Sequence, residues 1–188
     1  MILPIVAYGH PVLKKVAEEI PQDYPGINEL IVNMFETMYS SSGIGLAAPQ
    51  VNHSIRVFIV DATPLADEHP ELTDFKRVFI NPIIVEDSDE MEAAEEGCLS
   101  IPNIRENVLR HKEIVVEYYD ENWNLKEEKF EGFAARVVQH EYDHIEGVLF
   151  VERINTLRKT MINRKLKNIS TGEVDVDYKM LFPLRKKK

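Results

Sequence analysis

Apolar side chains recur at helical spacing between residues 27 and 38, and polar side chains occupy the opposite face. A stripe of this kind is typical of an amphipathic helix that packs against a core. A second helix is expected from about residue 133. A third is expected over residues 155–167, with five apolar side chains that we place inside: Ile154, Leu157, Met161, Ile162 and Leu166.

Strand patterns lie between the first and second helices. Residues 56–60, 77–80 and 114–119 are rich in β-branched and aromatic side chains, which favours strands. A polar turn at residues 120–122 predicts that residues 123–130 return as an antiparallel partner of the third strand.

Polar segments separate these elements. Residues 64–74 contain prolines and residues 86–96 are strongly acidic, so both are expected to be exposed loops. Because the strands do not alternate regularly with helices, the pattern favours an α+β fold. We expect a mostly antiparallel sheet packed around a central helix, with a C-terminal helix. A length of 188 residues fits one domain, placed at residues 1–168, and a polar, then basic tail at 169–188.

Composition adds few constraints. Hydrophobic residues make up 44% of the chain and charged residues 29%, which is ordinary for a globular protein. No apolar run reaches the length that spans a bilayer, so no membrane association is expected. Cys98 is the only cysteine, which excludes an intrachain disulfide and favours a reducing, cytoplasmic location.

The net charge of −10 is unevenly distributed. Residues 153–188 contain eleven Lys/Arg and three Asp/Glu, whereas residues 1–152 contain eleven and twenty-nine. The basic end either binds a polyanion or is a solvated terminal helix, and the charge pattern is compatible with both interpretations.

The second helix carries a sequence with chemical meaning, His140-Glu141-x-x-His144. Side chains four residues apart lie on one face of a helix, so both imidazoles can bind one metal ion. Glu141 lies to the side, where it can exchange a proton with metal-bound water. The alternative is a surface helix that carries two histidines by chance, and a third ligand would decide between them.

Three positions bear on the identity of that third ligand, and two of them, Glu173 and Cys98, could supply it. Phe150 stands where one large metalloprotease group has its third histidine, and its apolar ring excludes that group. Glu173 follows the last helix, but it lies in a polar stretch without helical pattern. Cys98 follows Gly97, which allows the backbone to turn sharply. A lone cysteine is usually part of the core, but beside two metal-binding histidines it becomes the preferred ligand.

Three segments, residues 43–50 (GIGLAAPQ), 96–100 (EGCLS) and 139–144 (QHEYDH), occur in this order. Together they resemble the signature motifs of the peptide deformylase family, and the likeness extends over residues 4–155. These enzymes hydrolyse the formyl group from the N-terminal formylmethionine of nascent polypeptides and release formate. The resemblance implies Cys98, His140 and His144 as metal ligands and Glu141 as the general acid/base while metal-bound water attacks the formyl carbonyl. It also implies that the Gln50 amide and the Leu99 backbone N–H bind the oxygen of the tetrahedral intermediate.

Substrate contacts are expected nearby. The resemblance places Gly45 against the substrate backbone and Arg105 near the substrate, where Arg105 either binds peptide or supports the site. Val137 and Phe133 lie three and seven residues before His140 and share its helix face. With Ile44, they are expected to line an apolar pocket for the methionine side chain. An ordinary core position explains Val137 and Phe133 equally well.

The metal and the partners are less constrained. One divalent ion is expected, and the resemblance implies Fe(II) in the cell, although two imidazoles and a thiolate also suit Zn(II), Ni(II) or Co(II). We expect a monomer, with the basic helix and tail as a candidate contact with ribosomal RNA. The alternatives are a metallopeptidase with another substrate and a non-catalytic ribosome-associated protein with a structural metal. Structural sites normally have four protein ligands, and the sequence offers three.

Overall fold

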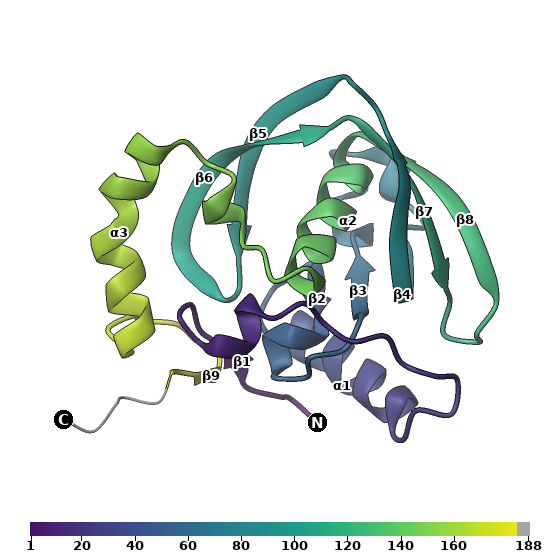
Figure 1. Ribbon diagram of the computed structural model, residues 1–188, viewed down its shortest axis with the longest axis horizontal. Helices are drawn as coiled ribbons and strands as arrows, with labels where there is room; N and C mark the ends of the chain where they lie inside the picture. The colour runs from purple at the N-terminus through teal and green to yellow at the C-terminus, as the bar shows by residue number, and fades with distance from the viewer. Residues whose placement is uncertain (184–188) are drawn as a thin grey trace.

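The computed structural model describes residues 1–183. Its main sheet has five antiparallel strands in the order β2-β3-β4-β7-β8 (Figure 1). Their bounds are β2 Gly45–Ala47, β3 Val57–Asp61, β4 Lys76–Asp87, β7 Glu113–Tyr119 and β8 Leu125–Glu131. The longer helices are α1 Ile27–Ser40, α2 Gly132–Ile145 and α3 Thr156–Thr171. Short 3-10 helices are η1 Pro11–Lys14, η2 Ala48–Val51, η3 Thr63–Leu65, η4 Pro70–Leu72 and η5 Phe150–Glu152. The predicted α+β class is confirmed.

The α2 helix lies at the centre of the molecule, and the main sheet curves around one side of it (Figure 1). All five residues of β3 are buried, because both faces of this strand are covered. Phe58 and Val60 pack in the core that contains the apolar face of α2. Val57 and Ile59 point the other way, into the core that contains the apolar face of α1. Because successive side chains of a strand point to opposite faces, β3 packs against α2 on one face of the sheet and against α1 on the other.

A second sheet replaces the acidic loop expected at residues 86–96. Strand β4 continues to Asp87, and β5 Met91–Cys98 pairs with β6 Ile101–His111 as an antiparallel hairpin. The hairpin lies between α2 and α3 (Figure 1). The loop prediction was therefore wrong, and β6 had not been predicted at all.

The end of this hairpin is irregular where Cys98 stands. Gly97 pairs with Arg105, but the next residue, Cys98, pairs with Ile101, so residues 102–104 bulge out of β6. Asn103 in the bulge has a φ of 62°, a left-handed conformation that asparagine tolerates. The bulge and the two-residue turn after Cys98 place the thiol at the tip of the hairpin.

The α3 helix covers the outer face of β6 with one stripe of side chains. Ile162, Leu166 and Ile169 are buried in this contact. The prediction that Leu157 and Met161 lie inside was wrong, because their side chains are 72% and 63% exposed. With about 100° of rotation per residue, both lie outside the stripe that faces the hairpin.

The C-terminal residues return to the body of the protein. Helix α3 runs across the expected boundary at residues 168 and 169, and β9 Met180–Leu181 pairs in parallel with β1 Ile5–Val6. The division into a domain and a tail stays a prediction, and the basic residues 185–188 lie outside the described range. Within residues 1–183, no helix combines the length and the apolar character needed to cross a membrane.

Candidate metal centre

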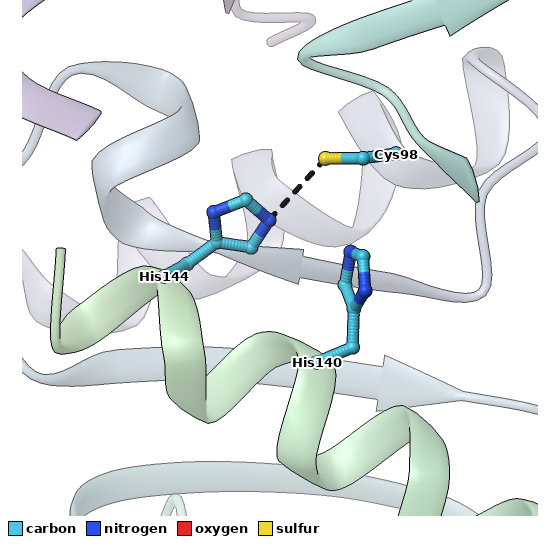
Figure 2. Close-up of side chains that lie close together, drawn as sticks. All are labelled: Cys98, His140 and His144. Carbon is cyan, nitrogen blue, oxygen red and sulfur yellow. Dashed lines mark hydrogen bonds between the residues drawn. The ribbon is translucent and has the colours of Figure 1, made fainter. Parts of the chain in front are cut away.

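The structure brings together the three residues expected to bind a metal. Each of Cys98, His140 and His144 offers one ligand atom, and these atoms lie within 4.8 Å of one another. Both imidazoles rise from one face of α2, one turn apart, and the thiol reaches them from the tip of the β5–β6 hairpin (Figure 2). Residues distant in the sequence thus converge because the hairpin crosses α2.

Hydrogen bonds orient the two rings. Nδ1 of His140 lies 2.9 Å from a carboxylate oxygen of Glu96, so its Nε2 is left for an ion. Nε2 of His144 lies 3.3 Å from the Cys98 sulfur, and its buried Nδ1 has no hydrogen-bond partner in the part of the chain that the structure describes. A carboxylate behind a metal-binding histidine sets the tautomer and raises the basicity of the ligand.

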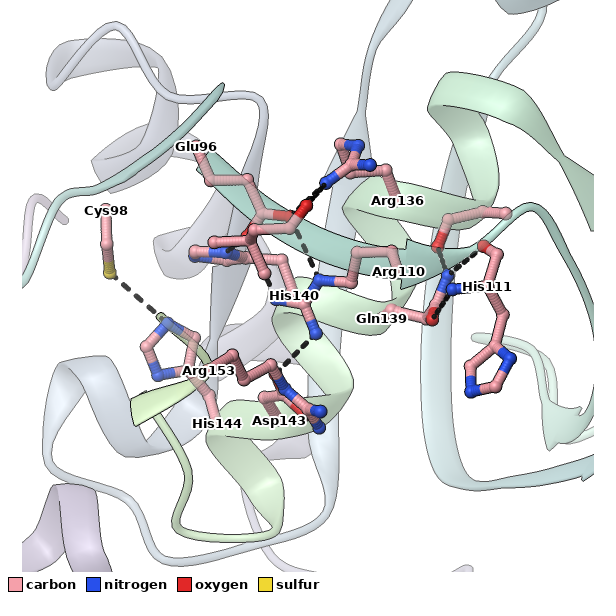
Figure 3. Close-up of polar contacts among 12 residues, drawn as sticks. Glu96, Cys98, Arg110, His111, Arg136, Gln139, His140, Asp143, His144 and Arg153 are labelled. Carbon is pink, nitrogen blue, oxygen red and sulfur yellow. Dashed lines mark hydrogen bonds and ion pairs between the residues drawn. The ribbon is translucent and has the colours of Figure 1, made fainter. Parts of the chain in front are cut away.

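Glu96 belongs to a buried ionic network that joins the hairpin to α2 (Figure 3). The Arg110 guanidinium donates to both oxygens of Glu96 at 2.9 Å, and Arg136 donates to one of them at 2.7 Å. Arg110 also donates to Asp143 at 2.6 Å, and Arg153 contacts the same carboxylate. Since α2 carries Asp143 and both histidines, the network fixes the position of the helix relative to the hairpin.

The charges of the site favour a cation. Burial lowers the pKa of His140, but its hydrogen bonds to Cys98 and Glu96 outweigh burial, so the pKa is raised. The contacts with the Cys98 sulfur and the Glu96 carboxylate therefore stabilise positive charge at His140. Burial and the charge of His140 lower the pKa of His144, which keeps that imidazole neutral. A thiolate and neutral imidazoles are the forms that ligate metals.

Glu141 lies beside these ligands and is almost completely buried. One of its carboxylate oxygens has no hydrogen-bond partner among the described residues, which leaves it available for a molecule in the site. Burial raises the pKa of Glu141 to about 7, although the charge of His140 acts in the opposite direction. A carboxylate whose pKa is near neutrality can both take and return a proton.

Gln50 is held in one orientation at the same site. Its side-chain oxygen accepts a hydrogen bond from the Ala47 backbone N–H at 2.8 Å. Its Nε2 therefore faces the hairpin tip, 3.4 Å from the Cys98 sulfur and 3.3 Å from the Ser100 hydroxyl. Leu99 and Ser100 form the two-residue turn directly after the thiol. The amide donor of Gln50 and the turn thus lie side by side.

A cavity of about 770 Å³ opens in front of these groups. Its lining includes Ile44, Gly45, Arg105, Val137 and Tyr178, together with Glu141 and two of the expected ligands. Arg105 is largely exposed and lies 3.7 Å from Glu95. Phe133 does not appear among the described residues that line the cavity; its ring stacks on His69 with centroids 4.7 Å apart.

Three residues that contact the site had no predicted role. Glu96 could have been found from strand periodicity, because it lies two residues before Cys98 and shares its face. Arg110 gave no signal, since a charged residue in a strand is normally exposed. Tyr178 lies 80 residues beyond Cys98 in the sequence, and only the folded chain brings it to the cavity.

The chain is similar to known proteins over most of its length. A family model described as polypeptide deformylase matches residues 2–160. A peptide deformylase from Christiangramia forsetii is 54% identical over 194 aligned positions, which cover 100% of this chain and 99% of the relative. Another from Flavobacterium johnsoniae is 52% identical with the same coverage. The crystal structure of a peptide deformylase from Legionella pneumophila shares 33% identity at a TM-score of 0.80, covering 92% of this chain and 98% of the other.

The fold and the comparisons define the class of protein as an α+β hydrolase. Its Cys98, His140 and His144 side chains lie close enough together to hold a metal ion. The chain belongs to the polypeptide deformylase family, metal-dependent enzymes that remove the formyl group from nascent polypeptides.

Proposed function

We propose that this chain hydrolyses the formyl group of N-terminal formylmethionine and releases formate. The observation that carries the proposal is the Cys98/His140/His144 cluster at the wall of the cavity. Beside it lies a carboxylate oxygen of Glu141 that has no hydrogen-bond partner within residues 1–183. Catalytic metal sites use three protein ligands and keep one position open. The three donors of this site match that number.

Cys98, His140 and His144 would hold one divalent ion. When bound, such an ion lowers the pKa of a coordinated water to about 7 and polarises a carbonyl oxygen. We propose Fe(II) in the cell, and Zn(II), Ni(II) or Co(II) suit the same donors. The contacts of His140 with the Cys98 sulfur and the Glu96 carboxylate stabilise positive charge at this site, and this supports the choice of a cation.

Glu141 is the proposed general base and acid. It takes a proton from the attacking water and gives it to the departing amino group, so the products are formate and a free N-terminus. The position of Glu141 supports this role because its free oxygen is shielded from solvent. Burial favours the protonated carboxyl, so the proton can be held between the two steps.

Gln50 and Leu99 are the proposed donors to the oxygen that becomes negative during the reaction. The amide of Gln50 is preoriented by Ala47, and the Leu99 N–H lies in the adjacent turn. Donors fixed in advance stabilise developing charge without reorganisation, and removing one costs roughly 3 kcal/mol of transition-state stabilisation.

The methionine side chain is proposed to lie against Val137 and Ile44, which line the cavity. Gly45 and Arg105 are proposed to meet the peptide, since both line the same cavity. Val137→Asp should reduce the preference for formyl-Met over formyl-Gly peptides, measured as the ratio of their kcat/KM values. An unchanged ratio would refute the pocket.

The central test measures formate release from a formyl-Met peptide by protein purified without oxygen, with its metal counted. Glu141→Ala should keep the metal and lose about 10²- to 10⁴-fold in kcat. Cys98→Ala should lose the metal. Glu127→Ala removes an exposed glutamate of β8 and serves as the matched control. Normal turnover by Glu141→Ala would disprove the mechanism, and cleavage of unformylated peptides would favour the metallopeptidase alternative.

A contact with ribosomal RNA is proposed for the exposed face of α3. Lys159, Arg164, Lys165 and Lys167 are exposed on this helix. Basic side chains that bind phosphates give an affinity that falls steeply with salt. Co-sedimentation with ribosomes should therefore weaken as salt rises, and sedimentation that does not depend on these four residues would exclude the contact. We also propose a cytoplasmic location, because a single cysteine suits a reducing compartment. A monomer is proposed as well, because the net charge of −10 opposes association between copies of the chain.

A further inference from the structure

The C-terminal arm, defined as residues 173–183, is built into the wall of the candidate site. Helix α3 ends at Gly172 in a left-handed conformation, which turns the chain back towards the body. The backbone N–H of Ile5 donates to Lys179 at 2.8 Å, and that of Ala7 donates to Leu181 at 2.9 Å. This arm lies beyond residue 160, where the match to the family model ends. The arm therefore lies outside the part of the chain that the family model matches.

Two hydrogen bonds join the arm to the hairpin tip that carries Cys98. The Tyr178 hydroxyl donates to the backbone carbonyl of Leu99 at 2.8 Å. The Asn103 side chain donates to the backbone carbonyl of Asp175 at 3.2 Å. Leu99 lies in the turn and Asn103 in the bulge, so the arm holds the tip at both of its irregular positions.

We propose that Tyr178 is a positioning residue for the reaction, whose hydroxyl fixes the Leu99 turn so that the Leu99 N–H stays directed at the reacting oxygen. This inference rests on the proposed function, because it assigns Leu99 as an oxyanion donor. The turn is also held at Ser100, whose carbonyl accepts from the Tyr8 N–H at 2.9 Å. Tyr178 restrains Leu99 itself in the same way, through the hydrogen bond from its hydroxyl to the Leu99 carbonyl.

The tyrosine is suited to this task in two ways. Its side chain lines the cavity, so it reaches the turn from the substrate side. Burial raises the pKa of Tyr178, and the negative charge of Cys98 raises it further. The hydroxyl therefore keeps its proton and remains a donor at neutral pH.

The test replaces Tyr178 by phenylalanine, which removes the hydroxyl and keeps the ring. Loss of one hydrogen bond to the turn should lower kcat roughly five-fold, leave KM within about two-fold and leave the metal content unchanged. Hydrogen–deuterium exchange of metal-free protein should show faster exchange at the Leu99 amide. The control is Tyr118→Phe, which removes a buried hydroxyl that donates to Glu128 at 2.6 Å on β7 and β8, away from the cavity.

Two measurements keep this inference separate from the proposed function. If wild-type protein releases no formate, the proposed function fails, but amide exchange at Leu99 still tests the restraint by Tyr178. If Tyr178→Phe matches wild type in kcat and in exchange at Leu99, the positioning role is refuted. If Tyr178→Phe lost stability without a change in kcat, as is expected for Tyr118→Phe, the contact of Tyr178 would be purely structural. That result would also refute the positioning role.

Discussion

Gly45 and Glu141 approach so closely that no side chain fits between them. A Cβ atom built on Gly45 would lie 2.4 Å from one carboxylate oxygen of Glu141 and 2.8 Å from its carboxyl carbon. Contacts of this length are far inside van der Waals distance. The motif glycine, expected from the sequence to meet the substrate, is therefore required by the proposed acid/base as well.

Gly45→Ala should displace the carboxylate of Glu141 while the fold persists, because a side chain moves more easily than two packed elements. A displacement of about 1 Å at a reacting group costs roughly 100-fold in rate, so we expect kcat/KM for formate release to fall by about that factor. The thermal midpoint should change little.

Gly26→Ala is the matched control for this substitution. A Cβ at Gly26 meets no atom of residues 1–183 within 4 Å, but the residue has a φ of +75° that alanine adopts with strain. This variant should lose stability and keep its activity, the reverse of Gly45→Ala. Full activity of Gly45→Ala would show that the site accommodates the methyl group.

Individual residues differed in how far the sequence predicted them. His140, Glu141 and His144 could be found because a helix converts a spacing of four residues into one face. Cys98 could be found by elimination and by resemblance. Tyr178 could not be found, because its contact with Leu99 depends on where the chain goes after α3, and Gly172 marks the end of the helix but not the direction of the residues that follow.

At the scale of elements, the β5–β6 hairpin was missed because three of its buried positions are charged, one of them Glu96 on β5. Alternate residues of β6 are buried, and they include Glu106 and Arg110 as well as Ile104 and Val108. Glu106 pairs with Arg158 on α3, and Arg110 pairs with Glu96 and Asp143. Because partners from other elements satisfy these charges, the hydrophobic alternation that indicates a strand is absent from the sequence.

Arg110→Met should test how strongly the hairpin depends on this network. The variant leaves two buried carboxylates with fewer partners, and breaking a buried ion pair costs about 3–5 kcal/mol of unfolding free energy. Urea denaturation of metal-free protein at pH 7 would measure the loss. We also expect weaker metal binding, because Glu96 orients His140.

Lys129→Met is the control for that experiment. Lys129 forms ion pairs with Glu113 and Glu131 on the surface of the sheet, where solvent screens the charges. Its replacement should have little effect on the urea midpoint. Equal midpoints for the two variants would show that the buried network contributes no more than a surface pair.

For the molecule as a whole, stability should depend on pH through carboxylates held in ion pairs. Burial raises the pKa of Glu128, but hydrogen bonds from Arg77 and Tyr118 outweigh burial and leave the pKa lowered. A lowered folded pKa stabilises the protein above the ordinary value, and this contribution is lost as pH falls through the folded pKa.

The difference in unfolding free energy between wild type and Glu128→Gln should therefore be constant from pH 6 to 8 and shrink below about pH 4.5. Urea titrations at several pH values would follow it. Glu127→Gln, at the neighbouring exposed position, should show no such dependence. If the difference in unfolding free energy between wild type and Glu128→Gln stayed the same at low pH, the role of Glu128 would be contradicted.

The parallel pairing of β1 with β9 has a consequence for how the protein is made. Residues 180 and 181 are synthesised 175 residues after residues 5 and 6, yet the two pairs are neighbours in one sheet. Pairs so distant in sequence form late in folding, because the intervening chain must first be ordered. The cavity gains its Tyr178 wall only when that pairing closes. A protein proposed to act on the first residue of nascent chains thus completes its own site only after residue 181 has been synthesised.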